Sequence, residues 1–188
     1  MTTSLFNSSL STLAPLAGSS LAKQAMIVLG GTIGLAALSQ VAIGYPVPTT
    51  LQTLGVMLIG LTFGFRLATA TLVAYLAGGA AGLPFFAPFG AGTSGYLIGF
   101  LLAAALIGYL ADRGFTRSWL GTIAALFAGE AVIFGLGVAW LSQAFNMSAS
   151  EAIAAGLTPF LLVDAIKLAL AALIGKGVLK GAEQFAKL

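Results

Sequence analysis

The stretch Pro159-Phe160-Leu161-Leu162-Val163-Asp164-Ala165-Ile166-Lys167-Leu168-Ala169-Leu170 carries two opposite charges inside an otherwise apolar run. Asp164 and Lys167 are three positions apart, which on a helix is about 300° of turn, so both side chains project from nearly the same face. A charge at membrane depth costs at least about 2.5 kcal/mol on insertion scales, so an apolar helix rarely keeps one without a use. The pair either joins helices as an internal ion pair or forms the polar floor of a pocket for a small ligand.

The composition indicates that this helix lies in a lipid bilayer. Hydrophobic residues make up 59% of the 188 residues and charged residues only 7%, with a mean hydropathy of +1.06. A soluble domain carries about 25% charged residues to cover its surface. Eight basic and five acidic side chains cannot coat a globule of this length. We therefore expect an all-α integral membrane protein with a single membrane domain.

Six apolar segments follow a polar lead-in, at 24–44, 50–65, 67–83, 93–111, 119–141 and 158–178. Residues 1–22 are rich in Ser, Thr and Ala and lack the basic start of a signal peptide. We expect them to form a polar N-terminal tail, followed by a compact six-helix domain over residues 23–188. A helix needs about 20 residues to cross the hydrocarbon, so the second and third segments are short. They are alternatively one bent hairpin, but we keep them as two spans.

The basic residues predict the orientation. Seven of the eight Lys and Arg residues lie at the ends of alternate segments: Lys23, Arg66, Arg113, Arg117, Lys176, Lys180 and Lys187. The eighth is Lys167, and the opposite connections 44–49, 84–92 and 142–157 contain no Lys or Arg. Cytoplasmic loops attract basic residues, so both termini are expected on the cytoplasmic side. Because the basic residues are scattered at segment ends rather than clustered, they do not suggest nucleic acid as a partner.

Glu130 is a third charge at membrane depth. With a rise of 1.5 Å per residue, Asp164 lies about 9 Å and Lys167 about 13 Å below the outer start of the last segment near Thr158. The fifth segment runs the other way and brings Glu130 to about 16 Å from its cytoplasmic start near Trp119. Glu130 and Lys167 can therefore share a layer. We favour a structural role for Glu130, as the partner of Lys167, over direct contact with a ligand.

The outer connections carry residues suited to a small-molecule pocket. Residues 44–53 combine prolines with hydroxyl groups and an amide, and residues 78–96 mix glycines with aromatic side chains. Proline stiffens a loop, aromatic rings offer flat apolar surfaces, and the polar groups offer hydrogen bonds. The same glycines and rings can instead simply pack helices in lipid. Separately, Gly30, Gly34 and Ala37 form a small-residue stripe that permits close helix contact, within the bundle or with another subunit.

Four motifs occur in an order that resembles a known family: Pro48-Thr49-Thr50-Leu51-Gln52, the segment ending Gly82-Leu83-Pro84-Phe85-Phe86, the pair Gly95-Tyr96, and Asp164-Xaa-Xaa-Lys167. Over about residues 25 to 180 the chain resembles BioY, the biotin-specific substrate-binding (S) components of energy-coupling factor (ECF) transporters. The resemblance implies a six-helix protein of a prokaryotic cytoplasmic (inner) membrane that holds biotin near the outer surface. It also implies a transmembrane coupling subunit and two ATPases as partners, no cofactor or metal of its own, and toppling in the membrane to release the vitamin.

The resemblance further implies a binding site. Asp164 would accept a hydrogen bond from biotin's ureido ring and Lys167 would donate one to an oxygen, because charge-assisted bonds are the stronger kind. The expected lining is Asp164, Lys167, Tyr96, Gln52, Thr50, Thr49, Phe85, Phe86 and Thr93, with Tyr45 and Glu130 in supporting positions. Leu97 stands where some family members carry Arg. The partner of biotin's carboxylate is therefore either a hydroxyl group of Thr49, Thr50, Thr93 or Ser94, or water at the mouth of the pocket.

Two other classes of function remain. A solitary secondary transporter for a small organic solute would use Glu130 or Asp164 as a proton carrier. A membrane enzyme or a scaffold is the third class. The chain lacks Cys and His, and no nucleophile stands with a base, so we expect no enzymatic activity. A phosphate-binding GxxxxGK[ST] loop is also missing from the sequence, so the chain by itself cannot hydrolyse ATP.

Overall fold

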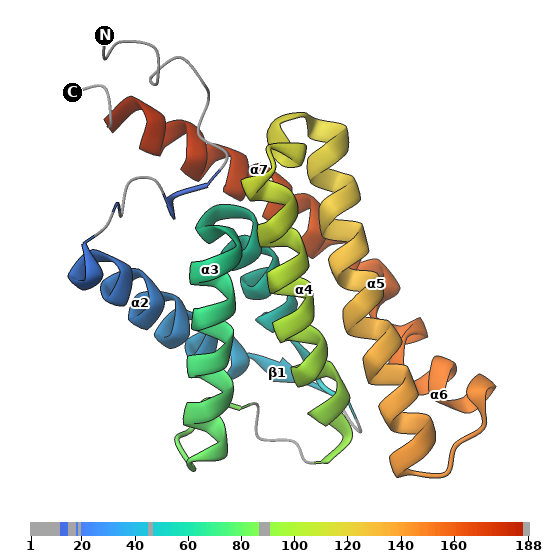
Figure 1. The fold of residues 1–188 in the computed structure, drawn as a ribbon. Helices are drawn as coiled ribbons and strands as arrows, with labels where there is room; N and C mark the ends of the chain where they lie inside the picture. Colours follow the sequence, from blue (N-terminus) through green and yellow to red (C-terminus); the bar gives the residue numbers. More distant parts are fainter. Residues whose placement is uncertain (1–11, 15–17, 19, 45–46, 87–90, 186–188) are drawn as a thin grey trace, which may run out of the picture.

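The computed structural model describes residues 12–14, 18, 20–44, 47–86 and 91–185. These residues are almost entirely helical (Figure 1). The helices are α2 (Leu21–Ser39), α3 (Gln52–Ala80), α4 (Ser94–Asp112), α5 (Trp119–Ala144), α6 (Ala149–Gly156) and α7 (Leu161–Phe185). Short 3-10 turns at Ala91–Thr93, Phe115–Arg117 and Thr158–Phe160 precede α4, α5 and α7. One small β-hairpin, β1 (Ala42–Ile43) with β2 (Thr49–Thr50), departs from the all-α expectation.

Within the described ranges, five helical stretches are long and apolar enough to cross a membrane. They are Leu21–Ser39, Gln52–Ala80, Ser94–Asp112, Trp119–Ala144 and Ala149–Gln184. The last of them joins α6 and α7. This confirms a helical membrane protein, whereas six separate crossings and the side on which the termini lie stay predictions.

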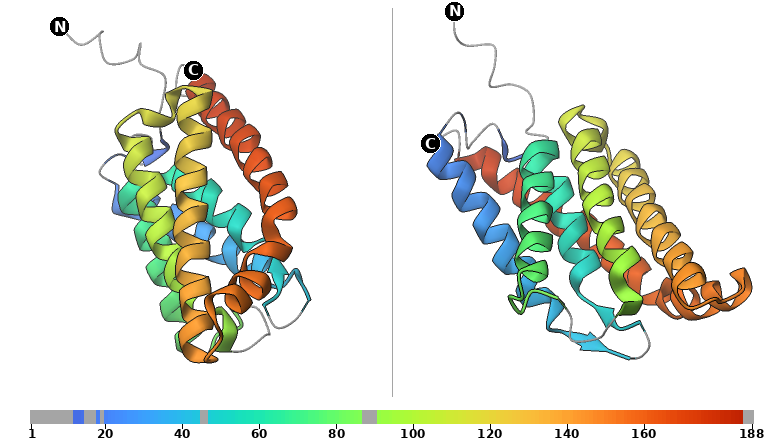
Figure 2. Two further views of the ribbon diagram at one scale, coloured as in Figure 1. Left: turned by 90° about the vertical axis from the view of Figure 1, so that its right-hand side faces the viewer. Right: turned by 60° about the horizontal axis from the view of Figure 1, so that its bottom comes forward.

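Helix α3 doubles back on itself at Gly64, whose φ of 78° and ψ of 172° are not helical. Gln52 Nε2 donates to the Tyr75 hydroxyl at 2.7 Å. A straight helix would separate these two residues by about 35 Å, so the chain must reverse between them. Figure 2 shows the two arms, residues 52–63 and 65–80, side by side. Glycine adopts this positive φ without a steric penalty. The expected second and third segments are therefore the arms of one broken helix.

Asp112, the last residue of α4, holds this reversal. Its Oδ2 accepts a hydrogen bond from the backbone N–H of Phe65 at 2.8 Å, and its Oδ1 accepts one from the Thr12 hydroxyl at 3.2 Å. The Leu13 N–H donates to the Thr62 carbonyl at 2.6 Å. Thr12 is buried here although it belongs to the expected polar tail. A short part of that tail thus packs against the end of the bundle.

Helix α4 lies between α3 and α5, and glycines allow the close approach (Figure 1). A Cβ on Gly108 would come within 2.8 Å of the backbone at Gly64, and a Cβ on Gly99 within 2.8 Å of the Ile133 Cα. Small residues let helix backbones meet where lipid offers no hydrophobic drive for association. The end of the bundle opposite to Asp112 carries the β-hairpin, the start of α4 and α6 (Figure 2). That end positions the site described next.

Helix α6 lies in what the sequence analysis treats as the connection 142–157. Its N-cap is Ser148, whose side chain accepts from the Glu151 N–H while the Glu151 carboxylate accepts from the Ser148 N–H at 2.8 Å. This Ser-Xaa-Xaa-Glu capping box satisfies two backbone donors that would otherwise be unpaired. The motif is present in the sequence and could have predicted the helix.

Candidate ligand-binding cavity

A cavity opens at the hairpin end of the bundle. It encloses about 40 Å³ of free space, or about 510 Å³ of empty space when its open mouth is counted. Its walls come from the hairpin, α3, α4, α5 and α7, through Val47, Pro48, Thr50, Gln52, Thr53, Phe86, Thr93, Tyr96, Leu97, Phe100, Phe134, Phe160, Asp164 and Lys167. A concave, mostly apolar and aromatic space with a few convergent polar groups is typical of a small-molecule site.

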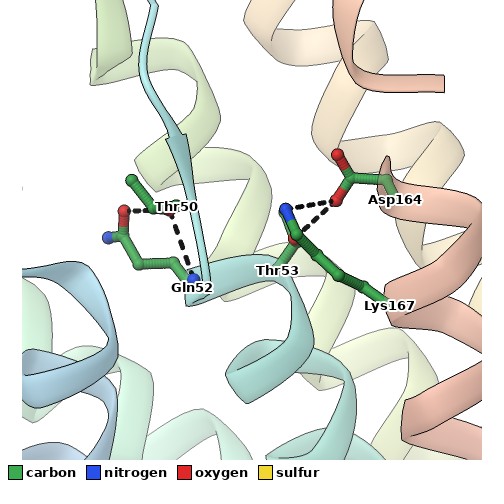
Figure 3. A network of polar contacts seen from close by, with 5 residues as sticks. All are labelled: Thr50, Gln52, Thr53, Asp164 and Lys167. Carbon is green, nitrogen blue, oxygen red and sulfur yellow. Dashed lines mark hydrogen bonds and ion pairs between the residues drawn. The ribbon is translucent and has the colours of Figure 1, made fainter. Parts of the chain in front are cut away.

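The polar floor of the cavity is a buried cluster of three side chains (Figure 3). Lys167 Nζ lies 3.0 Å from Asp164 Oδ1 and donates to the Thr53 hydroxyl oxygen at 3.1 Å. The Thr53 hydroxyl donates to the same Asp164 Oδ1 at 2.6 Å. Asp164 is 2% exposed and Lys167 4% exposed. Helix α7 supplies the ion pair from one face, as the spacing predicts, and the first turn of α3 supplies Thr53.

The cluster keeps hydrogen-bonding capacity for a guest. An ammonium group has three N–H donors, and two of those on Lys167 are used by Asp164 and Thr53. Both contacts of Asp164 go to Oδ1, and Figure 3 shows its second carboxylate oxygen pointing away from Lys167 and Thr53. The floor therefore keeps one N–H donor on Lys167 and one acceptor oxygen on Asp164. That pairing suits a ligand that presents an N–H next to a carbonyl.

A second network fastens the hairpin to the rest of the wall. The Thr50 hydroxyl donates to Gln52 Oε1 at 2.8 Å, and Gln52 Nε2 donates to the Tyr75 hydroxyl at 2.7 Å. The Tyr75 hydroxyl in turn donates to the Phe85 carbonyl at 2.7 Å. The Phe85 ring stacks on Tyr75 with centroids 6.1 Å apart. These polar groups hold each other, so Gln52 serves here to position the loops above the floor.

Tyr96 contributes its ring to the cavity. Its hydroxyl donates to the Gly156 carbonyl at 2.6 Å, which ties α4 to the end of α6. The ring meets Phe134 edge to face, with centroids 6.3 Å apart. The donor capacity of the hydroxyl is therefore used within the protein, while the ring lines the cavity.

The structure brings together most of the side chains expected to bind a ligand. Asp164, Lys167, Tyr96, Gln52, Thr50, Phe86 and Thr93 line the cavity. Thr49 and Phe85 are not among its lining residues; Phe85 instead packs on Tyr75 behind it. Tyr45 lies outside the described residues. The binding roles of all of these residues stay predictions.

No hydrogen bond or ion pair joins Glu130 to Lys167 among the described residues, and the expected structural role of Glu130 stays a prediction. Lys167 bonds to Asp164 and Thr53 instead, and Glu130 Oε1 is buried without a hydrogen-bond partner in the described ranges. On α2, a Cβ added at Gly30 or Gly34 would meet nothing within 4 Å, so this part of the small-residue stripe faces outward and packs against no neighbour in the described structure.

Thr53 and the aromatic wall formed by Phe100, Phe134 and Phe160 were not predicted from the sequence. Thr53 is the last hydroxyl residue of the stretch 44–53, which is only a weak signal in the sequence. It contacts Lys167 and Asp164 because of the way α3 packs against α7. The phenylalanines carry no signal of their own. Phe134 lines the cavity while Phe127, two turns earlier on the same helix, is 67% exposed.

Three comparisons with known proteins all point to the same protein family. The BioY family profile matches residues 7–184. Relatives named biotin transporter BioY are 38% identical over 80% of this chain and 87% of the protein from Thermotoga maritima, and 32% identical over 79% of this chain and 87% of the protein from Rhizobium etli.

A solved structure is also similar. The crystal structure of the S-component for biotin from an ECF-type ABC transporter superposes with a TM-score of 0.75 at 26% identity, covering 91% of this chain and 94% of that one. The family match spans nearly the whole chain and includes every residue of the cavity floor. The chain therefore belongs to the BioY family.

Proposed function

We propose that this protein captures biotin as the S component of an ECF-type importer. The observation that carries the proposal is the buried Asp164–Lys167–Thr53 cluster at the floor of an aromatic cavity. Biotin's ureido ring presents N–H donors next to a carbonyl acceptor. Asp164 Oδ2 accepts from an N–H, and the remaining N–H of Lys167 donates to the carbonyl oxygen, both as charge-assisted bonds. The relatives named as biotin transporters support this assignment.

The aromatic wall suits the rest of the molecule. The rings of Tyr96, Phe134 and Phe160 flank the apolar fused rings and the valeryl chain of biotin, and the hairpin closes above them. The carboxylate would then lie at the mouth. There Leu97 offers no charge, so a hydroxyl group or water is its partner.

We place the mouth of the cavity on the extracytoplasmic side of a prokaryotic cytoplasmic membrane. The junction of α4 and α5, which carries Arg113 and Arg117, lies at the end opposite to the hairpin (Figure 1). The start of α2 and the end of α7 also lie away from the hairpin (Figure 2). Cytoplasmic ends are rich in basic residues, which supports both termini inside. The two arms of α3 then count as the second and third of six crossings.

Partners follow from the family and from the missing phosphate loop. A transmembrane coupling subunit and two ATPases would supply the energy, and toppling of this chain would deliver biotin inside. The outward face of α2 with Gly30, Gly34 and Ala37 is open to a helix of the coupling subunit, because small residues permit close contact.

A vitamin panel tests the proposal. The detergent-purified chain is titrated with biotin, thiamine, riboflavin and cobalamin by calorimetry and thermal shift. A ligand at about 100 times its dissociation constant should stabilise the fold by about 2.7 kcal/mol, and we expect this for biotin alone. A preference for another vitamin would overturn the substrate assignment and keep the binding fold. If none of the four vitamins stabilises the protein, both the substrate assignment and the role in vitamin binding are overturned.

A further inference from the structure

A second cavity lies between α5, α6 and α7. It contains about 1330 Å³ of empty space, its opening included, and it shares only Asp164 and Phe134 with the first cavity. Along α5 its lining extends from Ile123 to Val138, about 22 Å of helix. Ile123 is 46% exposed and Phe127 67% exposed, so the cavity borders the surface that α5 turns toward lipid.

Glu130 lies about halfway along this lining. Its side chain is nine-tenths buried, with 9% exposure, and its Oε1 has no hydrogen-bond partner among the described residues. Buried polar groups are nearly always paired, and an unpaired carboxylate at membrane depth is costly. The neighbouring side chains of the cavity are apolar, apart from Asp164. The partner that Glu130 needs is therefore one that the described chain does not supply.

The charges around the cavity are not balanced. Its lining holds two carboxylates, Glu130 and Asp164, and no Lys or Arg in the described ranges. Asp164 is neutralised by Lys167 at 3.0 Å, and the same ammonium also bonds to Thr53. Glu130 forms no ion pair within the described ranges, and its Oε1 has no hydrogen-bond donor. The two carboxylates therefore have one ammonium group between them, and a cationic guest would balance the second carboxylate.

The rest of the lining favours an apolar guest of moderate size. Phe127 and Phe134 flank Glu130 one turn away on each side of the same helix, and aliphatic side chains from α6 and α7 complete the wall. Aromatic faces attract cations by about 0.5–2 kcal/mol, more when water is excluded. About 680 Å³ of this space is open to a guest, which is sufficient for a drug-sized molecule.

We propose that this second cavity binds a lipophilic organic cation, an ammonium group on an apolar frame, which enters from the bilayer and pairs with Glu130. An acyl chain would fill the apolar space but leave Glu130 without a donor. A neutral alcohol would supply the donor but not the positive charge, and an anion would be repelled. A protonated amine supplies both. The site shares Asp164 and Phe134 with the biotin cavity but is otherwise lined by different residues, and the proposal does not depend on biotin binding.

The probe is aminoadamantane, a compact cage amine that is protonated near neutral pH. Methyladamantane is its uncharged counterpart of similar shape. The full chain is purified in an uncharged detergent, and binding of both compounds is measured by calorimetry without biotin. We expect saturable binding of the amine and at least about tenfold weaker binding of the hydrocarbon, since only the amine can pair with a buried carboxylate. Equal affinity for the two compounds, or no saturable binding of the amine, would overturn the proposal.

Two variants assign the binding to this cavity. Glu130→Gln keeps the shape and removes the charge, and it should weaken amine binding at least about tenfold. Gly135→Leu fills the space, because Gly135 lines the cavity and a Cβ there meets nothing within 4 Å. It should abolish amine binding.

Gly177→Leu is the matched control for the filling variant. Gly177 is also an exposed helical glycine with nothing within 4 Å of an added Cβ, but it lies outside the lining of both cavities. Its amine affinity should equal that of the wild type. Thermal unfolding of each variant shows that it is folded. If Glu130→Gln does not fold, the amine affinity of Gly135→Leu alone tests whether the amine binds in this cavity. Wild-type amine affinity in folded Gly135→Leu would contradict the assignment.

Discussion

Lys167 depends on two acceptors that come from different helices. Asp164, three residues earlier on α7, neutralises its charge, while Thr53 on α3 both accepts from it and donates to Asp164. A buried charge that loses one partner keeps its desolvation penalty without compensation. Single substitutions in this cluster should therefore have large effects on a ligand that completes the network.

Removing either charge should weaken biotin binding. We expect Asp164→Asn and Lys167→Ala each to raise the dissociation constant at least about tenfold, because the remaining charge is left unpaired beside the ligand. Calorimetry on the purified variants measures the change. Lys180→Ala, which removes an exposed Lys from the same helix, should bind as the wild type does. Unchanged affinity in both charge variants would refute the site.

Thr53 offers a finer test, since the sequence did not single it out. Thr53→Val keeps the shape and removes the hydroxyl that joins Lys167 to Asp164. An unsatisfied buried group costs about 1–3 kcal/mol, so biotin affinity should fall at least about fivefold. Thr69→Val is the control, because the Thr69 hydroxyl bonds only to the Phe65 carbonyl of its own helix. Equal losses in the two variants would mean that Thr53 has no special role.

Among the elements, the broken helix α3 has the greatest influence on the site. Its reversal at Gly64 brings Gln52 to Tyr75, and the resulting chain of hydrogen bonds runs from the hairpin to the Phe85 loop. The first arm also carries Thr53 into the floor cluster. A straight α3 would separate these groups, so the cavity depends on the backbone conformation of one glycine.

Gly64→Ala should destabilise the protein. An alanine resists the φ of 78°, and a Cβ there would collide with the Asp112 carboxylate that caps the second arm. Strain of this kind costs about 1–3 kcal/mol, which thermal unfolding in detergent will detect as a lower melting temperature. Gly177→Ala is the comparison, since that glycine is helical and faces open space. It should be as stable as the wild type or slightly more stable, because alanine favours a helix. Equal melting temperatures of the two variants would show that a side chain at position 64 causes no strain.

At the scale of the whole molecule, the question is whether this chain moves its ligand alone. Glu130 and Asp164 are acids at membrane depth, which is the feature that a proton-coupled transporter would need. Asp164 is held in an ion pair with Lys167, whereas Glu130 Oε1 has no hydrogen-bond partner among the described residues. The family match favours capture of biotin without independent pumping, and proton coupling through Glu130 is the alternative that experiment must separate from it.

Liposomes that contain only this chain distinguish the two functions. We expect biotin to be bound in proportion to the protein present, and the amount to be the same with and without an imposed pH gradient. Accumulation beyond that amount, driven by the gradient, would support a secondary transporter instead. Asp164→Asn liposomes give the background, because their binding site should be impaired. Radiolabelled biotin retained on rapid filtration measures both quantities.

Local patterns in the sequence were sufficient for the membrane class, for the long helices other than the joining of two segments in α3, and for the common face of Asp164 and Lys167. Hydropathy and helical periodicity depend on neighbours along the chain, so a linear sequence carries them directly. The capping box of Ser148 and Glu151 is also a local pattern, and it would have been sufficient to predict α6. Even the short lengths of 50–65 and 67–83 pointed to the bend that Gly64 makes.

The contacts between segments far apart in the chain were decided only by the tertiary structure. Thr53 reaches Asp164 across 111 positions of sequence. Lys167 bonds to Asp164 and Thr53, while Glu130 Oε1 has no hydrogen-bond partner in the part of the chain that the structure describes. Every apolar face of a membrane helix looks alike in sequence, because lipid and neighbouring helices are equally apolar. Which face meets a cavity, a helix or lipid therefore depends on close packing in three dimensions.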